Sequence, residues 1–275
     1  MAHENRICHR AKSTLLSIRL WIGNRLFGTV GPHGVRISRH RLIKGPCESG
    51  EVAALKYVAE HTSIPVPKVL KVHNFRDALY IELEYIEGDD LNTAWRCYLS
   101  PEQKQQILAE LGGYMSQLRS LEPPQTGLVA SASLESCIDY RVGQQTFGPF
   151  DGHADFHSFL RGYLPVEDCT DVFGQKVTDC HVRSYRSCFA HADLCPRNII
   201  VKDGKVAAII DWACGGWYPE YWEYTKAHYG QCNMPDWYEG LASVIGRYDD
   251  ELHAERLLWK LCDEPATPMI IARDH

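Results

Sequence analysis

Apolar residues change their spacing along the chain, and each change predicts a different element. In residues 77–85 apolar and polar side chains alternate, which is typical of a half-buried strand. In residues 101–121 apolar side chains instead recur every three or four positions, as on one face of a helix. Ser100 and Gln103 stand at its start with the spacing of a capping box, so the helix is expected to begin at Pro101.

The remaining periodic segments predict a mixed α+β chain. Residues 35–44 indicate one or two strands, and a helix is expected over 49–61. The prolines in 64–72 exclude a helix there and suit an extended edge strand. Further helices are expected over 154–163 and 249–262.

The first 34 residues are basic and partly amphipathic. Leu15, Ile18, Trp21 and Ile22 fall at helical spacing among several arginines. Two interpretations stay open: a helix that packs on the following strands, which we favour, or an organelle-targeting presequence, which is rich in Arg and poor in acids.

The clearest chemistry lies in residues 190–212. Two β-branched runs are separated by an Asp-Gly turn, which favours a tight hairpin. A hairpin brings its ends together, so Asn198 and Asp211 should face one point, where their oxygens would suit a divalent cation. Asp193 lies on the loop just before, where it would accept the proton of an attacking hydroxyl.

The wording HADLCPRNIIV followed by AIIDW resembles the aminoglycoside phosphotransferase and choline kinase family of the protein-kinase-like superfamily. The resemblance implies a bilobed protein-kinase-like fold of the α+β class, with a small β-rich N-lobe and a larger, mostly helical C-lobe. It assigns Asp193 as the catalytic base, His191 as a residue that braces the loop, and Asn198 and Asp211 as Mg²⁺ ligands. The implied division is a basic helical extension, the N-lobe and the C-lobe, at residues 1–34, 35–87 and 88–275.

The resemblance also implies a nucleotide site for ATP or GTP. Lys44 and Glu51 match the strand lysine and helix glutamate that hold nucleotide phosphates, although Glu48 is a competing partner. The segment EYIEGDDL resembles an inter-lobe hinge, in which backbone groups would hydrogen-bond the adenine edge. These hinge residues are Glu84, Tyr85 and Ile86. The phosphate-covering loop is poorly matched, because the glycines of residues 28–34 lack the GxGxxG spacing.

Charge and aromatic content add a hypothesis about the acceptor. The formal net charge of −6 resides in residues 213–264, where ten acidic side chains accompany four basic ones. Such a region repels nucleic acid and would attract a cationic small molecule, although acids on exposed helix faces would give the same count. The aromatics there either build the core or line an acceptor site. The acceptor-site candidates are Trp217, Tyr218, Glu220, Glu223, Asp236 and Trp237.

Other features set limits on the class of protein. Eleven scattered cysteines indicate reduced thiols, which favours a cytoplasmic location, and no apolar run is long enough for a membrane span. We expect a monomer or weak dimer. His153 and His157 have the spacing of a helical metal pair, but no cysteine or acidic motif accompanies them, so a solvated face is expected.

The sequence therefore predicts a small-molecule O-phosphotransferase that moves the γ-phosphate of ATP or GTP to a hydroxyl. A protein kinase is disfavoured because Ala192 replaces the arginine that reads a phosphorylated activation loop, and because Asp211 precedes Trp-Ala, not Phe-Gly. Two alternatives stay open: a catalytically silent nucleotide-binding scaffold, and a fold repurposed for a different biosynthetic reaction.

Overall fold

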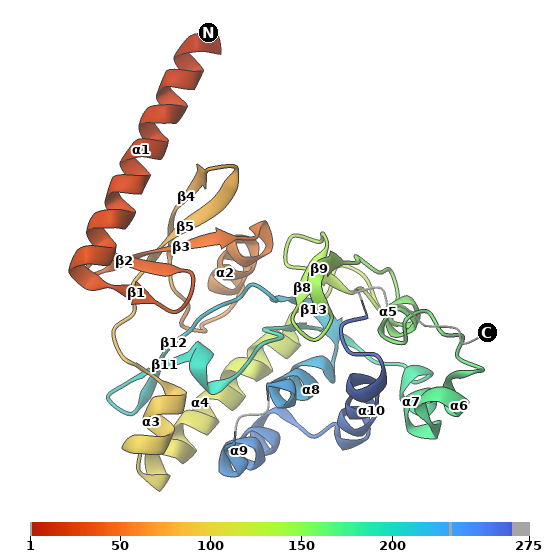
Figure 1. Cartoon of the computed structure of the whole chain (residues 1–275). Coiled ribbons are helices and arrows are strands. Elements are labelled where there is room, and N and C mark those ends of the chain that lie inside the picture. The colour runs from red at the N-terminus through yellow and green to blue at the C-terminus, as the bar shows by residue number, and fades with distance from the viewer. Residues whose placement is uncertain (1, 231–232, 266–275) are drawn as a thin grey trace.

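The computed structural model describes residues 2–230 and 233–265, with the backbone alone for residues 2–12 and 144. An antiparallel sheet occupies the N-terminal part, and a mostly helical region follows it (Figure 1). The expected α+β fold with a small β-rich N-lobe and a larger helical C-lobe is thus confirmed.

The N-lobe sheet has five antiparallel strands in the order β1-β2-β3-β5-β4. Residues 35–44 supply parts of two strands, and the alternating segment becomes the fifth strand in sequence, which pairs with β3. The prolines of 64–72 precede the edge strand, which begins only at Val69. The strands are β1 (Thr29–Val30), β2 (Gly34–Ser38), β3 (Arg41–Cys47), β4 (Val69–Phe75) and β5 (Ala78–Glu84).

Helices cover both faces of this sheet. α2 (Ser49–His61) packs its apolar side on the face that carries Ile81 and Leu83. α1 (Ala2–Phe27) lies across the other face, where Leu16 joins the core formed by Ile43 and Phe75. The packing interpretation of the N-terminal segment therefore holds for the half of α1 that touches the sheet. Because β1 belongs to the sheet, we propose that the N-lobe starts at Thr29, before the expected boundary at residue 35.

Glu82 of β5 shows what α1 adds to the N-lobe. The alternating pattern puts Glu82 on the polar face of its strand, yet it is 1% exposed because α1 covers that face. Its carboxylate accepts hydrogen bonds from Arg19 of α1 and from Arg41, both at 2.9 Å. Burial alone would raise the pKa of Glu82, but these partners and His73 lower it to about 2.

Replacing Glu82 by Gln is expected to lower the free energy of unfolding by about 2 kcal/mol, because the substitution removes a buried carboxylate with several cationic partners. The loss is limited because Arg19 and Arg41 are partly exposed to water. The pKa of the carboxyl is depressed in the folded state, so its contribution is present above its ordinary pKa of 4.5 and is lost as pH falls towards about 2. Urea unfolding measured across this range checks both statements. A Glu87→Gln control, at an exposed ion pair, should unfold like the parent, and equal unfolding of the two variants would contradict the account.

The longest helix of the C-lobe has the start signal that the sequence predicts. Ser100 and Gln103 cap each other's backbone in a capping box at the N-terminus of α4 (Pro101–Ser120). Its apolar side enters the main core with Leu108, Leu111 and Met115. The other helices are α3 (Leu91–Cys97), α5 (His153–Leu160), α6 (Cys169–Phe173), α7 (Gln175–His181), α8 (Trp222–Tyr229), α9 (Pro235–Ile245) and α10 (Asp249–Leu261).

Short strands complete the C-lobe in two three-stranded sheets and one hairpin, with the strand orders β10-β13-β7, β12-β11-β6 and β8-β9. They are β6 (Asp89–Asp90), β7 (Ala130–Ser131), β8 (Cys137–Asp139), β9 (Gly143–Phe147), β10 (Ser187–Ala190), β11 (Ile199–Lys202), β12 (Lys205–Ile209) and β13 (Gly216–Pro219).

The histidines of α5 do not lie on a solvated face, and that expectation was wrong. His157 is buried, its ring stacks on His181 at 4.4 Å, and its Nε2 lies 2.9 Å from the hydroxyl of Tyr221. His153 lies 3.0 Å from the hydroxyl of Ser187. The reason is that α5 packs within the C-lobe, so its polar positions are paired internally. Within residues 2–230 and 233–265 no group of three or more His, Cys, Asp or Glu side chains is placed to hold a metal.

No helix among the described residues has the length and apolar content that crossing a membrane requires.

Candidate active site

The predicted hairpin brings the two expected metal ligands to the same end. β11 and β12 pair antiparallel from Ile199 and Ile209 to the turn. At the open end, the Ile210 N–H donates to the carbonyl of Asn198 at 2.8 Å, which fixes Asn198 beside the residue before Asp211. The side-chain amide nitrogen of Asn198 also donates to the Asp193 carboxylate at 2.9 Å. This bond leaves the side-chain oxygen of Asn198 available as a ligand for a cation. The donor set of amide and carboxylate oxygens fits Mg²⁺.

A second contact joins the N-lobe to this end of the hairpin. The Nζ of Lys44 lies 2.6 Å from the Glu51 carboxylate and 2.8 Å from that of Asp211. Glu48 is the residue before α2 and is exposed, which settles the choice of helix partner in favour of Glu51. The strand lysine, the helix glutamate and the aspartate expected to bind a metal therefore meet in one cluster.

The cluster keeps opposite charges in a partly buried place. Burial opposes the charge of Lys44, but the carboxylates of Glu51 and Asp211 outweigh it and raise the pKa of Lys44. Burial would likewise raise the pKa of Asp211, but the charge and hydrogen bond of Lys44 hold it below its ordinary value. At neutral pH the cluster thus holds an ammonium beside two carboxylates, charges that suit phosphate oxygens and a metal ion.

His191 links the loop that carries Asp193 to the segment between β12 and Asp211. Its ring is fully buried, and its Nε2 donates to the carbonyl of Ile210 at 2.9 Å. Its Nδ1 accepts the backbone N–H of Asp193 at 3.1 Å, which defines the neutral tautomer with the proton on Nε2. This geometry supports the bracing role expected of His191.

Glu223 of α8 supports the same loop from behind. Its carboxylate accepts the backbone N–H of His191 at 2.6 Å and that of Ala192 at 3.4 Å. Ala192 has a left-handed φ of 60°, which is strained for a residue with a Cβ and needs such support. Burial raises the pKa of Glu223, against the opposing influence of His191.

With this geometry in place, comparison with known proteins gives the family. Residues 35–258 match the model of the phosphotransferase enzyme family. The chain belongs to this family. No curated protein matches the sequence.

Solved structures of aminoglycoside phosphotransferases share the fold. A GDP complex of a mutant aminoglycoside 2'-phosphotransferase-IIIa aligns with a TM-score of 0.59 at 13% identity, covering 90% of this chain and 86% of that one. A ternary complex of a thermostable APH(4)-Ia mutant with ADP and hygromycin B aligns with a TM-score of 0.57 at 15% identity, covering 89% of each chain. A gentamicin complex of APH(2")-IIa aligns with a TM-score of 0.56 at 11% identity, covering 86% and 83%. At these identities the likeness concerns the fold.

The acceptor-site candidates of this phosphotransferase-family chain separate into core and surface residues. Trp217 and Trp237 are buried in the main core, and the fully buried Tyr218 donates its hydroxyl to the carbonyl of Cys214. This packing matches the core alternative, so we leave Trp217 and Trp237 out of the proposed acceptor site, whereas Tyr218 also borders the cavity described below. Aromatic side chains in a sequence report hydrophobic content without saying which side faces solvent.

The acidic candidates are also engaged elsewhere. Glu220 accepts from the Tyr248 hydroxyl at 3.2 Å and lies 3.6 Å from Arg119. Asp236, near the start of α9, accepts from the indole of Trp95 at 2.8 Å and from Lys104 at 3.1 Å. Glu223 holds the catalytic loop. We therefore leave these three out as well.

Two residues beside the catalytic base were not singled out in the sequence. The Nη2 of Arg197 lies 3.2 Å and 3.3 Å from the two carboxylate oxygens of Asp193, a contact that the i,i+4 spacing already permitted. Tyr140, on the β8–β9 turn, is half exposed. Burial raises its pKa to about 12, with smaller contributions from Cys214, Asp211 and Asp193, so its hydroxyl is neutral at pH 7. No sequence signal places that turn near the catalytic loop.

The hinge offers one free donor. The amides of Glu84 and Tyr85 are used within the N-lobe, donating at 3.0 Å to the carbonyls of Lys68 and His40. Within the described part of the chain no hydrogen bond engages the Ile86 amide. The turn between β1 and β2 leads into Gly34, the first residue of β2, which pairs directly with Lys44.

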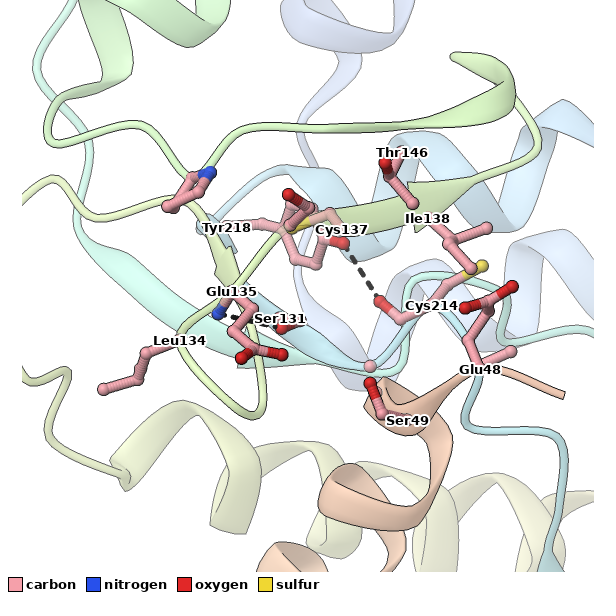
Figure 2. A pocket seen from close by; sticks show the side chains of 15 residues that line it. Glu48, Ser49, Ser131, Leu134, Glu135, Cys137, Ile138, Thr146, Cys214 and Tyr218 are labelled. Atoms are coloured by element: carbon pink, nitrogen blue, oxygen red, sulfur yellow. Dashed lines mark hydrogen bonds between the residues drawn. The ribbon is translucent and has the colours of Figure 1, made fainter. Parts of the chain in front are cut away.

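A cavity of about 490 Å³ opens next to the segment that follows Asp211. We call it the side cavity. Figure 2 shows Glu48 and Ser49 at the start of α2 on one side of it and Glu135 on another, with Cys214 between them and Ile138 above Cys214. Its lining includes two carboxylates and no Lys, Arg or His, which makes it attractive to a cation.

The Glu223→Ala variant is expected to fold less stably, by about 2 to 3 kcal/mol, because two buried backbone donors lose their acceptor. Turnover should fall as well, since the loop that carries Asp193 loosens, while Mg²⁺-nucleotide affinity changes little. Thermal unfolding and steady-state rates measured together check this. Glu239→Ala, at another acidic position of the C-terminal region, is the matched control. A stable but slow Glu239 variant, or an unaffected Glu223 variant, would contradict the bracing role.

Proposed function

We propose that this protein transfers the γ-phosphate of ATP or GTP to a hydroxyl of a small acceptor in a Mg²⁺-dependent reaction. The observation that carries the proposal is the cluster of Lys44, Glu51 and Asp211 beside the Asp193–Asn198 loop. Membership of the phosphotransferase enzyme family supports it, as do the ADP and GDP bound in structures that share the fold.

Each residue then has a physical task. Lys44, oriented by Glu51, would neutralise phosphate charge, and Asn198 and Asp211 would hold the metal ion, which supplies further charge compensation when bound. The Ile86 amide, with backbone carbonyls of Glu84 and Tyr85, would hold the adenine or guanine edge. Asp193 would orient the acceptor hydroxyl and accept its proton.

The side cavity is the proposed acceptor site. It is lined by Ala213 and Cys214, which follow Asp211 by two and three residues, and the half-exposed Tyr140 belongs to the turn beside it. In the described chain neither Glu48 nor Glu135 takes part in an ion pair. These carboxylates favour an acceptor that carries an amine as well as a hydroxyl.

A kinetic prediction tests this assignment. The Glu48→Gln, Glu135→Gln double variant should raise the KM for an amine-bearing acceptor about fivefold with kcat nearly unchanged, because exposed charges contribute modest binding energy. The KM for a neutral hydroxyl acceptor is the control and should stay constant. A common change in both KM values, or none in either, would remove the two carboxylates from acceptor recognition.

The activity itself is tested by ³¹P NMR of reactions that contain nucleotide, Mg²⁺ and a panel of hydroxyl compounds, amine-bearing ones first. A new phosphate monoester that requires Mg²⁺ is the expected product. The retained Lys44, Asp193, Asn198 and Asp211 argue against a silent scaffold, since a degenerate cleft has no need of all four. Bound nucleotide that stays intact with every acceptor would favour the scaffold, and a different product would favour a repurposed cleft.

A further inference from the structure

The N-terminal helix α1 has two apolar sides, and only one of them is covered. Leu16, Leu20 and Gly23 face the sheet; a Cβ at Gly23 would lie 2.6 Å from the Arg36 carbonyl, which shows how closely helix and sheet approach. The other side of the helix points away from the sheet and from the rest of the molecule (Figure 1).

Large apolar side chains lie exposed on that outer side. Trp21 is 68% exposed, Leu26 70% and Leu15 60%. Leu15, Ile18, Ile22 and Leu26 follow one another at intervals of three or four residues, so they form one continuous stripe along the helix. Of the sixteen exposed large hydrophobic residues found in the described chain, six belong to this helix. We call this stripe, with Trp21, the outer face.

The charge around the outer face is positive, whereas the rest of the protein is negative. α1 contains five Arg or Lys residues and one acid. Arg19 pairs with Glu82 on the sheet side, so the other four bases and the acid give a net charge of +3, whereas the residues outside α1 sum to −10. The acidic residues 213–264 belong mainly to α8, α9 and α10, which lie in the C-lobe at the end of the molecule opposite α1 (Figure 1). Screening by salt acts over about 10 Å, so those acids would not repel a surface that the helix touches.

We propose that the outer face of α1 binds an anionic lipid surface. An interfacial helix needs an apolar side with Trp and Leu, flanking basic side chains and free access, and α1 has all three. Trp21 and Arg25 stand side by side at the border of the stripe, the arrangement that suits a boundary between acyl chains and headgroups. A second copy of the chain fits less well, because two positively charged helices would then lie against each other.

The test is co-sedimentation of the full chain with vesicles of phosphatidylcholine alone and of phosphatidylcholine mixed with phosphatidylserine. The expected result is binding to the anionic vesicles that weakens with added salt, and much weaker binding to the neutral ones. Leu26→Asp should lower the partition coefficient by about tenfold or more, because it puts a charge in the stripe. Val182→Asp, at a residue 64% exposed outside α1, is the matched control and should bind as the parent does.

Three results would overturn the proposal: no binding of the parent to anionic vesicles, equal loss in both variants, or no loss in Leu26→Asp. Analytical ultracentrifugation without lipid tests the other possible partner of the outer face, a second copy of the chain. A dimer of the parent that Leu26→Asp converts to monomer would mean that a second copy covers the outer face. Thermal unfolding of each variant shows whether the fold is kept, and none of these readouts depends on phosphotransferase activity.

Discussion

Replacing Asp211 by Asn is expected to abolish Mg²⁺-dependent turnover, by about a thousandfold or more, while the protein stays folded. The carboxylate is the charged member of the proposed metal pair, and an amide holds a divalent cation far less well. Its side chain is 35% exposed, and its main partner, Lys44, keeps Glu51 after the substitution. Stability should therefore change little.

Steady-state rates over a range of Mg²⁺ concentrations, together with thermal unfolding, measure both effects. Asp203→Asn, at the turn of the same hairpin, is the control because it keeps the hairpin and lies at its other end. An Asp211 variant with the parent's rate would remove the metal assignment, and a variant that fails to fold would show that Asp211 has mainly a structural role.

Replacing Asp193 by Ala is expected to lower kcat by about a hundredfold to ten-thousandfold, the usual range for loss of a general base. Nucleotide affinity should be retained, because the nucleotide is held by Lys44, the metal ligands and the hinge. The variant also frees Arg197 and the Asn198 amide from their contacts with this carboxylate, so Arg197→Ala is needed beside it.

Rates and nucleotide titrations of the two variants decide the matter. If Asp193 is the base, its loss slows turnover and leaves the nucleotide dissociation constant near that of the parent, whereas Arg197→Ala retains most of the rate. Weakened nucleotide binding as the main effect of Asp193→Ala would place this residue in a different role.

The approach of Asn198 to Asp211 and of Lys44 to Glu51 could be predicted from the sequence because each pair is close along the chain. Asn198 and Asp211 are separated by one hairpin, and a tight Asp-Gly turn leaves little freedom in how its ends meet. Lys44 and Glu51 are also close in sequence. The competing Glu48 was resolved only by the structure, since it depends on where α2 begins.

The surroundings of the catalytic loop could not be predicted in the same way. Glu223 is more than thirty residues from His191, and its role depends on α8 packing behind the loop. The sequence pattern also placed His157 and Glu82 on polar sides of their elements, yet both are buried. A pattern shows which side of an element is polar, but tertiary packing decides whether water reaches that side.

The acceptor candidates show the same limit. Trp217 and Trp237 stand in an acidic, aromatic stretch that suits either a core or a cation site, and they are packed in the core. The side cavity is instead lined by segments from the N-lobe, the β8–β9 region and the strand after Asp211. Only the assembled fold brings such distant segments together.

The most direct test of the phosphotransferase assignment is calorimetric titration of the full chain with ATP and with GTP, each in the presence and absence of Mg²⁺. For a Mg²⁺-dependent phosphotransferase we expect that at least one nucleotide binds, that Mg²⁺ strengthens the binding, and that Asp211→Asn removes the Mg²⁺ effect. Absence of binding at millimolar nucleotide, or binding that ignores both Mg²⁺ and Asp211, would contradict it.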